Sequence, residues 1–331
     1  MSPIARKARA LIRGLILVTT AASAVVVLAQ PSAVVFPDKP VRFIVPFPPG
    51  GPNDVLARSV GQKLAEGWGQ PVVIENKPGA GSIIGIDAVA KAKPDGHAIG
   101  IVASSFVVNP SLHPKMPYDT LKDLRGVTQL AVAEIYLLAN PSLPANNVRE
   151  LIALAKASPG SLSYGSVGTG STAHLPGEML KTAAGIDILH VPYKGTNPAT
   201  VDLLSGRVQL MFHVLATQTA HIRSGKLKVL AVASQRRSAV FPDVPTVAET
   251  LPGFEASTLF GVVAPSGTPS TIVHKLNADM VRVLGTQEMK TLLSGLDLEP
   301  VGSTPEQFDA LIRAEMTKWA EVVRTAGVKL D

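Results

Sequence analysis

Two glycine-rich loops in this sequence have residue types that suit the binding of an anion. The first covers residues 47–54 and lies between a predicted strand and a predicted helix. Glycines let the backbone approach a ligand closely, and the unpaired N–H groups at the start of a helix favour an anionic group such as a carboxylate. An ordinary strand-to-helix turn, in which Asn53 or Asp54 caps the helix, explains the same residues. The candidate ligand-binding residues here are Phe47, Pro48, Gly50, Gly51, Asn53 and Asp54.

The second loop covers residues 165–174 and is rich in hydroxyl groups. Residues 168–173 also fit the G-x-G-x-x-A pattern of dinucleotide-binding loops. Asp187 lies at a suitable distance for a ribose contact, but it begins the next strand instead of ending it, so it would point away from a nucleotide. We therefore expect no cofactor. The candidate ligand-binding residues of this loop are Gly168, Thr169, Ser171, Thr172 and His174.

Four further residues follow predicted strands and complete the candidate site. Tyr193 could flank a ligand and Lys194 could supply a donor or a charge, although a surface turn with a solvated Lys194 fits equally well. Ser104 and His213 also lie at strand ends, where parallel sheets bind their ligands. His190 lies inside a short apolar strand and is expected to be a core residue.

The signals for an enzyme or a metal site are weak. The chain has seven histidines, with neither an H-x-x-H nor an H-E-x-x-H pair, and it has no cysteine. The G-x-S-x-G elbow of hydrolases is absent, because Ser166 directly follows Gly165. We therefore predict neither an enzyme nor a metal site. An extracytoplasmic hydrolase remains the weakest of the alternatives.

The elements that would position these loops alternate between strands and helices, which is typical of parallel α/β architecture. Apolar runs predict strands at residues 41–47, 71–75, 97–103, 162–166, 188–192, 208–212 and 227–234. Helical spacing of apolar residues predicts helices at 55–68, 83–92, 148–157, 173–184, 199–204, 217–224, 270–294 and 305–326.

Two extended apolar stretches, 129–139 and 257–264, do not fit this alternation. We interpret them as two crossings between lobes, which form a natural hinge. Lobe one then covers residues 30–132 and 255–331, and lobe two covers residues 133–254. A single doubly wound sheet with long insertions is the alternative.

The N-terminus is typical of a secretory signal. Arg6, Lys7, Arg9 and Arg13 precede an uncharged apolar run at residues 14–29. The run is short for a membrane-spanning helix, and its small-residue ending predicts cleavage after Ala29; an uncleaved anchor is the alternative.

Removal of this segment changes the charge of the chain. The whole chain has a formal net charge of +6, and four of its 31 basic residues lie before residue 30, so 27 basic and 25 acidic residues remain. With no clustered basic face, we exclude a nucleic-acid partner. Without cysteine the chain can have neither disulfides nor a lipid-modified cysteine. We therefore expect a free periplasmic protein.

Six ordered motifs spread over the chain resemble the Bug family of extracytoplasmic solute receptors. They are VPFPPGGPND at 45–54, GQPVVIENKPGAG at 69–81, AKPDG at 92–96, HVPYKG at 190–195, PDVPTVAE at 242–249 and APSGTP at 264–269. The resemblance implies a two-lobed fold like that of type II periplasmic binding proteins. It also implies a ligand carboxylate held by backbone donors and bridging water at residues 47–54 and 168–174, with Tyr193 and Lys194 lining the side.

The family also implies the partners. Its receptors serve tripartite tricarboxylate transporters, so a membrane permease and a small carboxylate ligand are expected, with the receptor acting as a monomer. A sensory receptor that docks on a membrane sensor kinase would need the same ligand clamp and stays open as the alternative.

Two departures from the family pattern bear on the ligand. Pro52 removes one N–H donor from the first loop. His213 stands where many relatives have an aspartate, which would suit the ammonium group of an amino acid. The departure predicts a non-amino carboxylate, such as a dicarboxylate or an aromatic acid.

Overall fold

The computed structural model describes residues 36–329, and one compact unit begins at Pro37. The predicted signal segment and its cleavage site at Ala29 lie outside the described residues. Within residues 36–329, no helix has both the length and the apolar character needed to span a bilayer.

A six-stranded mixed sheet forms the first lobe, with strand order β11-β4-β10-β3-β1-β2. Strand β1 pairs in parallel with β2 and β3, whereas β10 runs antiparallel to β3 and β4. The strands are β1 (Val41–Val45), β2 (Val72–Asn76), β3 (Ala98–Ala103), β4 (Leu124–Glu134), β10 (Ser257–Pro265) and β11 (Glu299–Pro300). The helices that follow or cover them are α2 (Pro52–Trp68), η1 (Ala80–Ser82), α3 (Ile83–Ala90), α4 (Ser105–Leu112), α9 (Ser270–Leu284), α10 (Gln287–Gly295) and α11 (Pro305–Ala326).

A five-stranded sheet forms the second lobe, with strand order β7-β6-β8-β5-β9. Strand β6 pairs in parallel with β7 and β8, and β5 runs antiparallel to β8 and β9. The strands are β5 (Tyr136–Ala139), β6 (Ser163–Ser166), β7 (Leu189–Pro192), β8 (Leu210–His213) and β9 (Lys228–Val232). The helices are α5 (Val148–Ala157), α6 (Leu175–Ala184), α7 (Thr196–Ser205), η2 (Leu215–Thr217), α8 (Thr219–Arg223) and η3 (Val247–Glu249).

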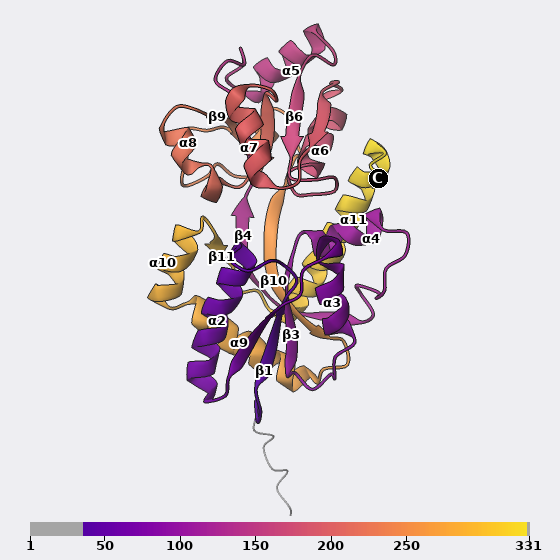
Figure 1. Ribbon diagram of the computed structural model, residues 1–331, viewed down its shortest axis with the longest axis vertical. Coiled ribbons are helices and arrows are strands. Elements are labelled where there is room, and N and C mark those ends of the chain that lie inside the picture. The colour runs from indigo at the N-terminus through magenta and orange to yellow at the C-terminus, as the bar shows by residue number, and fades with distance from the viewer. Residues whose placement is uncertain (1–35, 330–331) are drawn as a thin grey trace, which may run out of the picture. The chain divides into compact units, whose positions relative to one another are not determined.

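Two long strands, β4 and β10, connect the lobes. They pair with each other from Ser257–Glu134 to Pro265–Leu124, and β4 passes through the single residue Ile135 into β5 of the other sheet. Figure 1 shows both strands between the two lobes, with β4 running toward the second lobe and β10 returning to the first. The extended segments predicted at 129–139 and 257–264 thus lie in these connections.

Helix α11 supports both lobes. It begins with a capping box at Thr304, buries Trp319, and contacts α4 of the first lobe and α6 of the second. Figure 1 shows its C-terminal end beside α4. A helix in contact with both lobes supports their relative position beside the two connecting strands.

One helix prediction was wrong and one helix was not predicted. The stretch predicted as one helix at 270–294 is two helices, because α9 ends at Gly285 and Thr286 then caps α10. Helix α4 was not predicted at all, since Pro110 lies inside its eight residues and the segment lacks an amphipathic pattern. This omission matters because the N-terminus of α4 lies at the candidate site.

Candidate functional site

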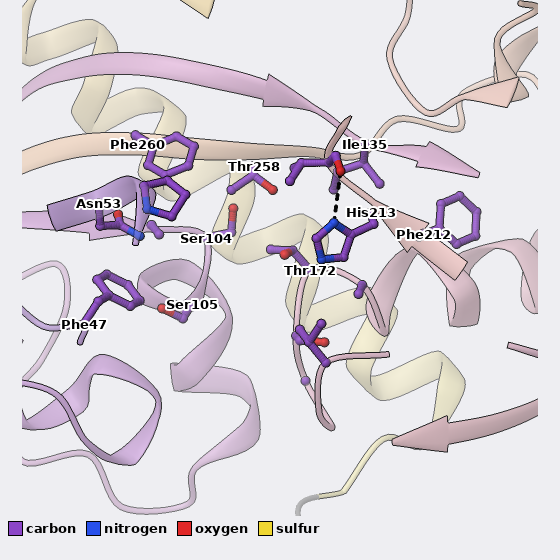
Figure 2. Close-up of a pocket in the computed structure, with 17 residues that line it drawn as sticks. Phe47, Asn53, Ser104, Ser105, Ile135, Thr172, Phe212, His213, Thr258 and Phe260 are labelled. Atoms are coloured by element: carbon purple, nitrogen blue, oxygen red, sulfur yellow. Dashed lines mark hydrogen bonds between the residues drawn. The ribbon is translucent and has the colours of Figure 1, made fainter. Parts of the chain in front are cut away.

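A cavity of about 270 Å³ lies where the two lobes meet. Residues of both sheets and of three strand-to-helix connections line it. Figure 2 shows Phe47, Asn53 and Ser105 on one side, Thr172 and His213 on the other, and Ser104 and Thr258 between them. The lining residues are Phe47, Pro52, Asn53, Ala103, Ser104, Ser105, Ile135, Val167, Gly170, Ser171, Thr172, Ala173, Phe212, His213, Val214, Thr258 and Phe260.

The first loop reaches the cavity through Phe47 and the first residues of α2. Pro52 is compatible with the first turn because its missing N–H would have no helical partner. Gly51 is the N-cap and has no side chain to offer, so the free N–H groups of the first turn remain available to a ligand. Of the candidates in this loop, Phe47 and Asn53 line the cavity, whereas Pro48, Gly50, Gly51 and Asp54 do not.

Asp54 holds the loop together instead of facing the cavity. One carboxylate oxygen accepts the N–H of Gly50 and the Nε–H of Arg58, both at 2.9 Å, and the other accepts from Asn76 Nδ2 at 2.8 Å. The contact with Arg58 is the main cause that lowers the pKa of Asp54 to about 2. The carboxylate therefore fixes the turn that presents Phe47 and Asn53.

The N-terminus of α4 supplies a second set of donors. The Oγ of Ser104 accepts the N–H of Leu259 at 3.1 Å, so its own O–H is free to donate elsewhere. Ser105 shares a hydrogen bond of 2.9 Å with Ser82. No side chain caps α4. Ser105 was missed at the sequence level, although its place directly after a parallel strand could have indicated it.

The second loop contributes the other wall of the cavity. Ser171 and Thr172, both candidates, line the cavity together with Val167, Gly170 and Ala173, whereas Gly168 and Thr169 do not. The Oγ of Ser171 accepts the N–H of His174 at 3.3 Å, which leaves its O–H free to donate. His174 is 3% exposed and lies beneath the loop.

His213 lines the cavity as a neutral side chain. Its Nδ1 lies 3.0 Å from the carbonyl oxygen of Val214, which can only accept, so the ring proton is assigned to Nδ1. Nε2 then accepts from Thr196 Oγ1 at 3.3 Å. Burial lowers the pKa of His213, which favours the uncharged form.

The remaining candidates, Tyr193 and Lys194, do not line this cavity. The hydroxyl of Tyr193 donates to Asp202 at 2.8 Å, and its ring packs beside Gly165. Tyr193 therefore packs against strand β6 and does not face the cavity.

The lining residues carry no charged side chain, but they include unpaired polar atoms. Within residues 36–329, the buried Oδ1 of Asn53 and Oγ1 of Thr258 have no hydrogen-bond partner. Buried polar groups without partners are rare, so these two are available to a bound molecule. Thr258 and Phe260 were missed at the sequence level because they lie along the antiparallel strand β10, to which the rule about strand ends does not apply.

The chemistry of the site is that of binding. Ser166 and His190 lie 2.7 Å apart, but Ser166 is fully buried, so its hydroxyl cannot reach a substrate. No group of three or more metal-ligating side chains occurs in the described part of the chain. The cavity offers uncapped helix N-termini, hydroxyl donors and an apolar wall that includes Phe47, Phe212 and Phe260.

Comparison with known proteins places this geometry in a family. The receptor family of tripartite tricarboxylate transporters matches residues 56–328. The chain is 41% identical over 307 residues to protein BugT of Bordetella pertussis, with 92% of this chain and 94% of BugT covered.

Two solved structures from Rhodopseudomonas palustris are similar along nearly their whole length. Rpa4515 with adipate has a TM-score of 0.77 at 35% identity, covering 89% of this chain and 99% of that chain. MatC with bound malate has a TM-score of 0.73 at 34% identity, covering 87% and 100%. The two-lobed fold and the resemblance to Bug receptors are thereby confirmed.

Members of this family are periplasmic solute-binding receptors and not enzymes. With most of its length matched by the family and by its relatives, the chain belongs to the receptor family of the tripartite tricarboxylate transporters.

Proposed function

We propose that this receptor captures a small non-amino carboxylate in the cavity between its lobes and delivers it to the permease of a tripartite tricarboxylate transporter. The observation that carries the proposal is the meeting of the uncapped N-termini of α2 and α4 with the loop at 166–174 around one uncharged cavity.

Helix N-termini explain how the cavity can hold an anion without a lysine or arginine. Each presents N–H groups that lack helical partners and the positive end of the helix dipole. The free hydroxyl protons of Ser104 and Ser171 add donors from opposite lobes. A carboxylate bridging these groups would favour the closed arrangement of the lobes.

The absence of an acidic side chain among the lining residues supports a ligand without an ammonium group. An ammonium group buried there would lack a counter-charge, which is costly in a desolvated site. The related structures with adipate and with bound malate have ligands of this kind.

The proposal also covers the bounds of the lobes, the residues that contact the ligand and the mature form of the receptor. Lobe one covers residues 30–132 and 255–331, and lobe two covers residues 133–254. The hinge lies where β4 and β10 leave the first sheet. The residues proposed to contact the ligand are the sequence candidates that line the cavity, extended by Ser105 and Thr258: Phe47, Asn53, Ser104, Ser105, Ser171, Thr172, His213 and Thr258. The mature protein begins after Ala29, works in the periplasm as a monomer, and docks on the permease when closed.

Thermal unfolding against a panel of ligands tests the function. The panel contains mono-, di- and tricarboxylates, including adipate and malate, together with aspartate, glutamate and nicotinate. A ligand at about 1,000 times its dissociation constant stabilises the protein by about 4 kcal/mol, which is a shift of several degrees. We expect a shift with non-amino carboxylates that Ser171→Ala reduces.

Three outcomes would contradict parts of the proposal. A strong response to aspartate or glutamate with none to non-amino acids would exclude the proposed ligand class. No response to any anion in the panel would contradict carboxylate capture. Binding of the closed receptor to a sensor-kinase ectodomain, with none to the permease, would replace the transport role with a sensory one.

A further inference from the structure

A stacked pair of histidines lies beneath the ligand loop at 166–174. The rings of His174 and His190 have centroids 3.8 Å apart and planes inclined by 16°. His174 is 3% exposed, and neither histidine lines the cavity. The pair is therefore close to the candidate site without being part of its surface.

Each histidine holds a different part of this loop. The N–H of Gly170 donates to Nδ1 of His174 at 2.9 Å. The Oγ of Ser166 lies 2.7 Å from Nε2 of His190 and accepts the N–H of Gly168 at 3.2 Å. The beginning and the middle of the loop are thus anchored to one buried pair.

The hydrogen bond from Gly170 determines the tautomer of His174. Because Nδ1 accepts an N–H, it carries no proton, and the neutral ring has its proton on Nε2. Nε2 faces the carboxylate of Glu178, whose Oε1 is 3.8 Å away. The same carboxylate accepts from Tyr164 at 2.6 Å and from Lys181 at 3.0 Å.

Glu178 stays ionised in this surrounding. Burial opposes its ionisation, but contacts with His174, Tyr164 and Lys181 hold the pKa of Glu178 at about 2. An ionised carboxylate beside Nε2 favours the tautomer with its proton on that nitrogen. Glu178 thereby keeps Nδ1 free to accept from Gly170.

The anchored loop is the part that faces the ligand. Gly170 lines the cavity with the three residues that follow it, and Ser171 also accepts the N–H of His174. Gly170 further packs against Leu112 of α4 in the other lobe. The position of Gly170 therefore determines where the hydrogen-bond donors of the loop lie and how closely the loop packs against the first lobe.

We propose that His174 is a positioning residue, whose neutral imidazole accepts the N–H of Gly170 and holds the loop in its ligand-binding conformation. Loss of this acceptor by substitution weakens carboxylate capture although the ligand does not touch His174. The inference rests on the proposed function for its effect on binding, and on geometry alone for its effect on the loop.

Two substitutions of His174 separate the effect of its hydrogen-bond acceptor from the effect of the size of its ring. Asparagine and leucine branch at the same atom and have similar size, but only asparagine places an acceptor near the position of Nδ1. Both remove the stacking on His190. A difference between His174→Asn and His174→Leu therefore reports the acceptor.

The first measurement needs no ligand. In the full protein, the ¹⁵N spectrum of the imidazoles should show His174 with its proton on Nε2. Amide exchange of Gly170 should be at least about tenfold faster in His174→Leu and within about threefold of the wild type in His174→Asn, as expected for loss or retention of one hydrogen bond. A proton on Nδ1, or equal exchange in all three proteins, would overturn the proposal.

The second measurement is the dissociation constant for adipate and for malate at pH 7. We expect His174→Asn, which keeps the acceptor, to bind within about threefold of the wild type, and His174→Leu to bind at least about tenfold more weakly. Equal affinity in all three proteins, or an equal loss in both variants, would contradict the positioning role.

The two measurements also separate this inference from the function. Failure of wild-type protein to bind either dicarboxylate would contradict the proposed ligand class, while the tautomer and the exchange of Gly170 still decide the role of His174. If His174→Leu does not fold, the wild-type tautomer and the amide exchange of Gly170 in His174→Asn decide it.

Discussion

Gly170 of the ligand loop and Leu112 of α4 pack directly against each other across the two lobes. A Cβ atom built on Gly170 would lie 2.2 Å from Cδ1 of Leu112. Gly170 also has a φ of +76°, in the left-handed region that favours glycine. The loop can approach the first lobe this closely only because residue 170 has no side chain.

Gly170→Ala should therefore weaken binding of adipate or malate by about tenfold or more, since the methyl group forces Leu112 out of place or the lobes apart. Gly185→Ala is the matched control, because Gly185 has a similar φ of +59° but open space around it. Both variants should lose about 1 kcal/mol of stability to backbone strain. Leu112→Ala should restore part of the affinity of Gly170→Ala in a double-mutant cycle, and strictly additive effects would argue against the contact.

The ligand class can be tested at His213. His213→Asp should reduce affinity for adipate and malate by about tenfold, because a buried carboxylate would repel the carboxylate of the ligand. The same variant should gain a thermal shift with aspartate or glutamate. His213→Asn introduces a side chain of similar size to aspartate but without its charge. It should therefore show neither the charge-dependent loss of affinity for adipate and malate nor the thermal shift with aspartate or glutamate. Unchanged ligand preference in His213→Asp would mean that residue 213 does not contribute to ligand selectivity.

The sequence predicted the fold well where local pattern and tertiary structure agree. Apolar runs such as 41–47 became central strands, and the two extended stretches became the connections between sheets. The prediction failed at α4, where Pro110 and the lack of an amphipathic pattern hide the helix. Helix α4 forms because tertiary packing buries Phe106, Val107 and Val108, which local propensity does not report.

The sequence identified the loops of the candidate site better than it identified the side chains that line the cavity. Phe47, Asn53, Ser171 and His213 reach the cavity, because helix starts after parallel strands face the same edge. Asp54 and His174 lie in the same loops but turn inward to hold them. Which way a polar side chain turns depends on partners such as Asn76 and Glu178 on other elements, and spacing along the chain does not reveal them.

Asp54 should be important for stability even though it does not line the cavity. Asp54→Asn removes the charge opposite Arg58 and places an NH₂ group against hydrogen-bond donors, so the free energy of unfolding should fall by roughly 2 kcal/mol at pH 7. The pKa of about 2 lies below the ordinary value, so this stability is present above about pH 4 and is lost as the pH falls toward 2. Urea unfolding at pH 7 and pH 2.5 measures it. Asp243→Asn, at an exposed residue, is the control; an equal effect of both substitutions would refute the role of Asp54.

His190 should make the receptor less stable in mild acid. Burial, with the nearby His174, lowers the pKa of His190 to about 4 from 6.5. The unfolded chain therefore binds a proton that the folded chain rejects, and stability falls as the pH drops from about 7 toward 4. After allowance for its partial exposure, the loss by pH 5 should be about 1–2 kcal/mol.

His190→Gln should be less stable than the wild type at pH 7, because the stacking on His174 is lost, but its stability should change less between pH 7 and pH 5. This window lies above the ordinary pKa of Glu178, 4.5, from which burial and its partners shift it to about 2, so the carboxylate contributes little to the difference. His221→Gln on α8 provides the control and should keep the wild-type slope. Urea unfolding of the three proteins at both pH values gives the comparison. An identical slope in His190→Gln and the wild type would show that another group rejects the proton, and the histidine pair beneath the ligand loop would then have no part in the acid response.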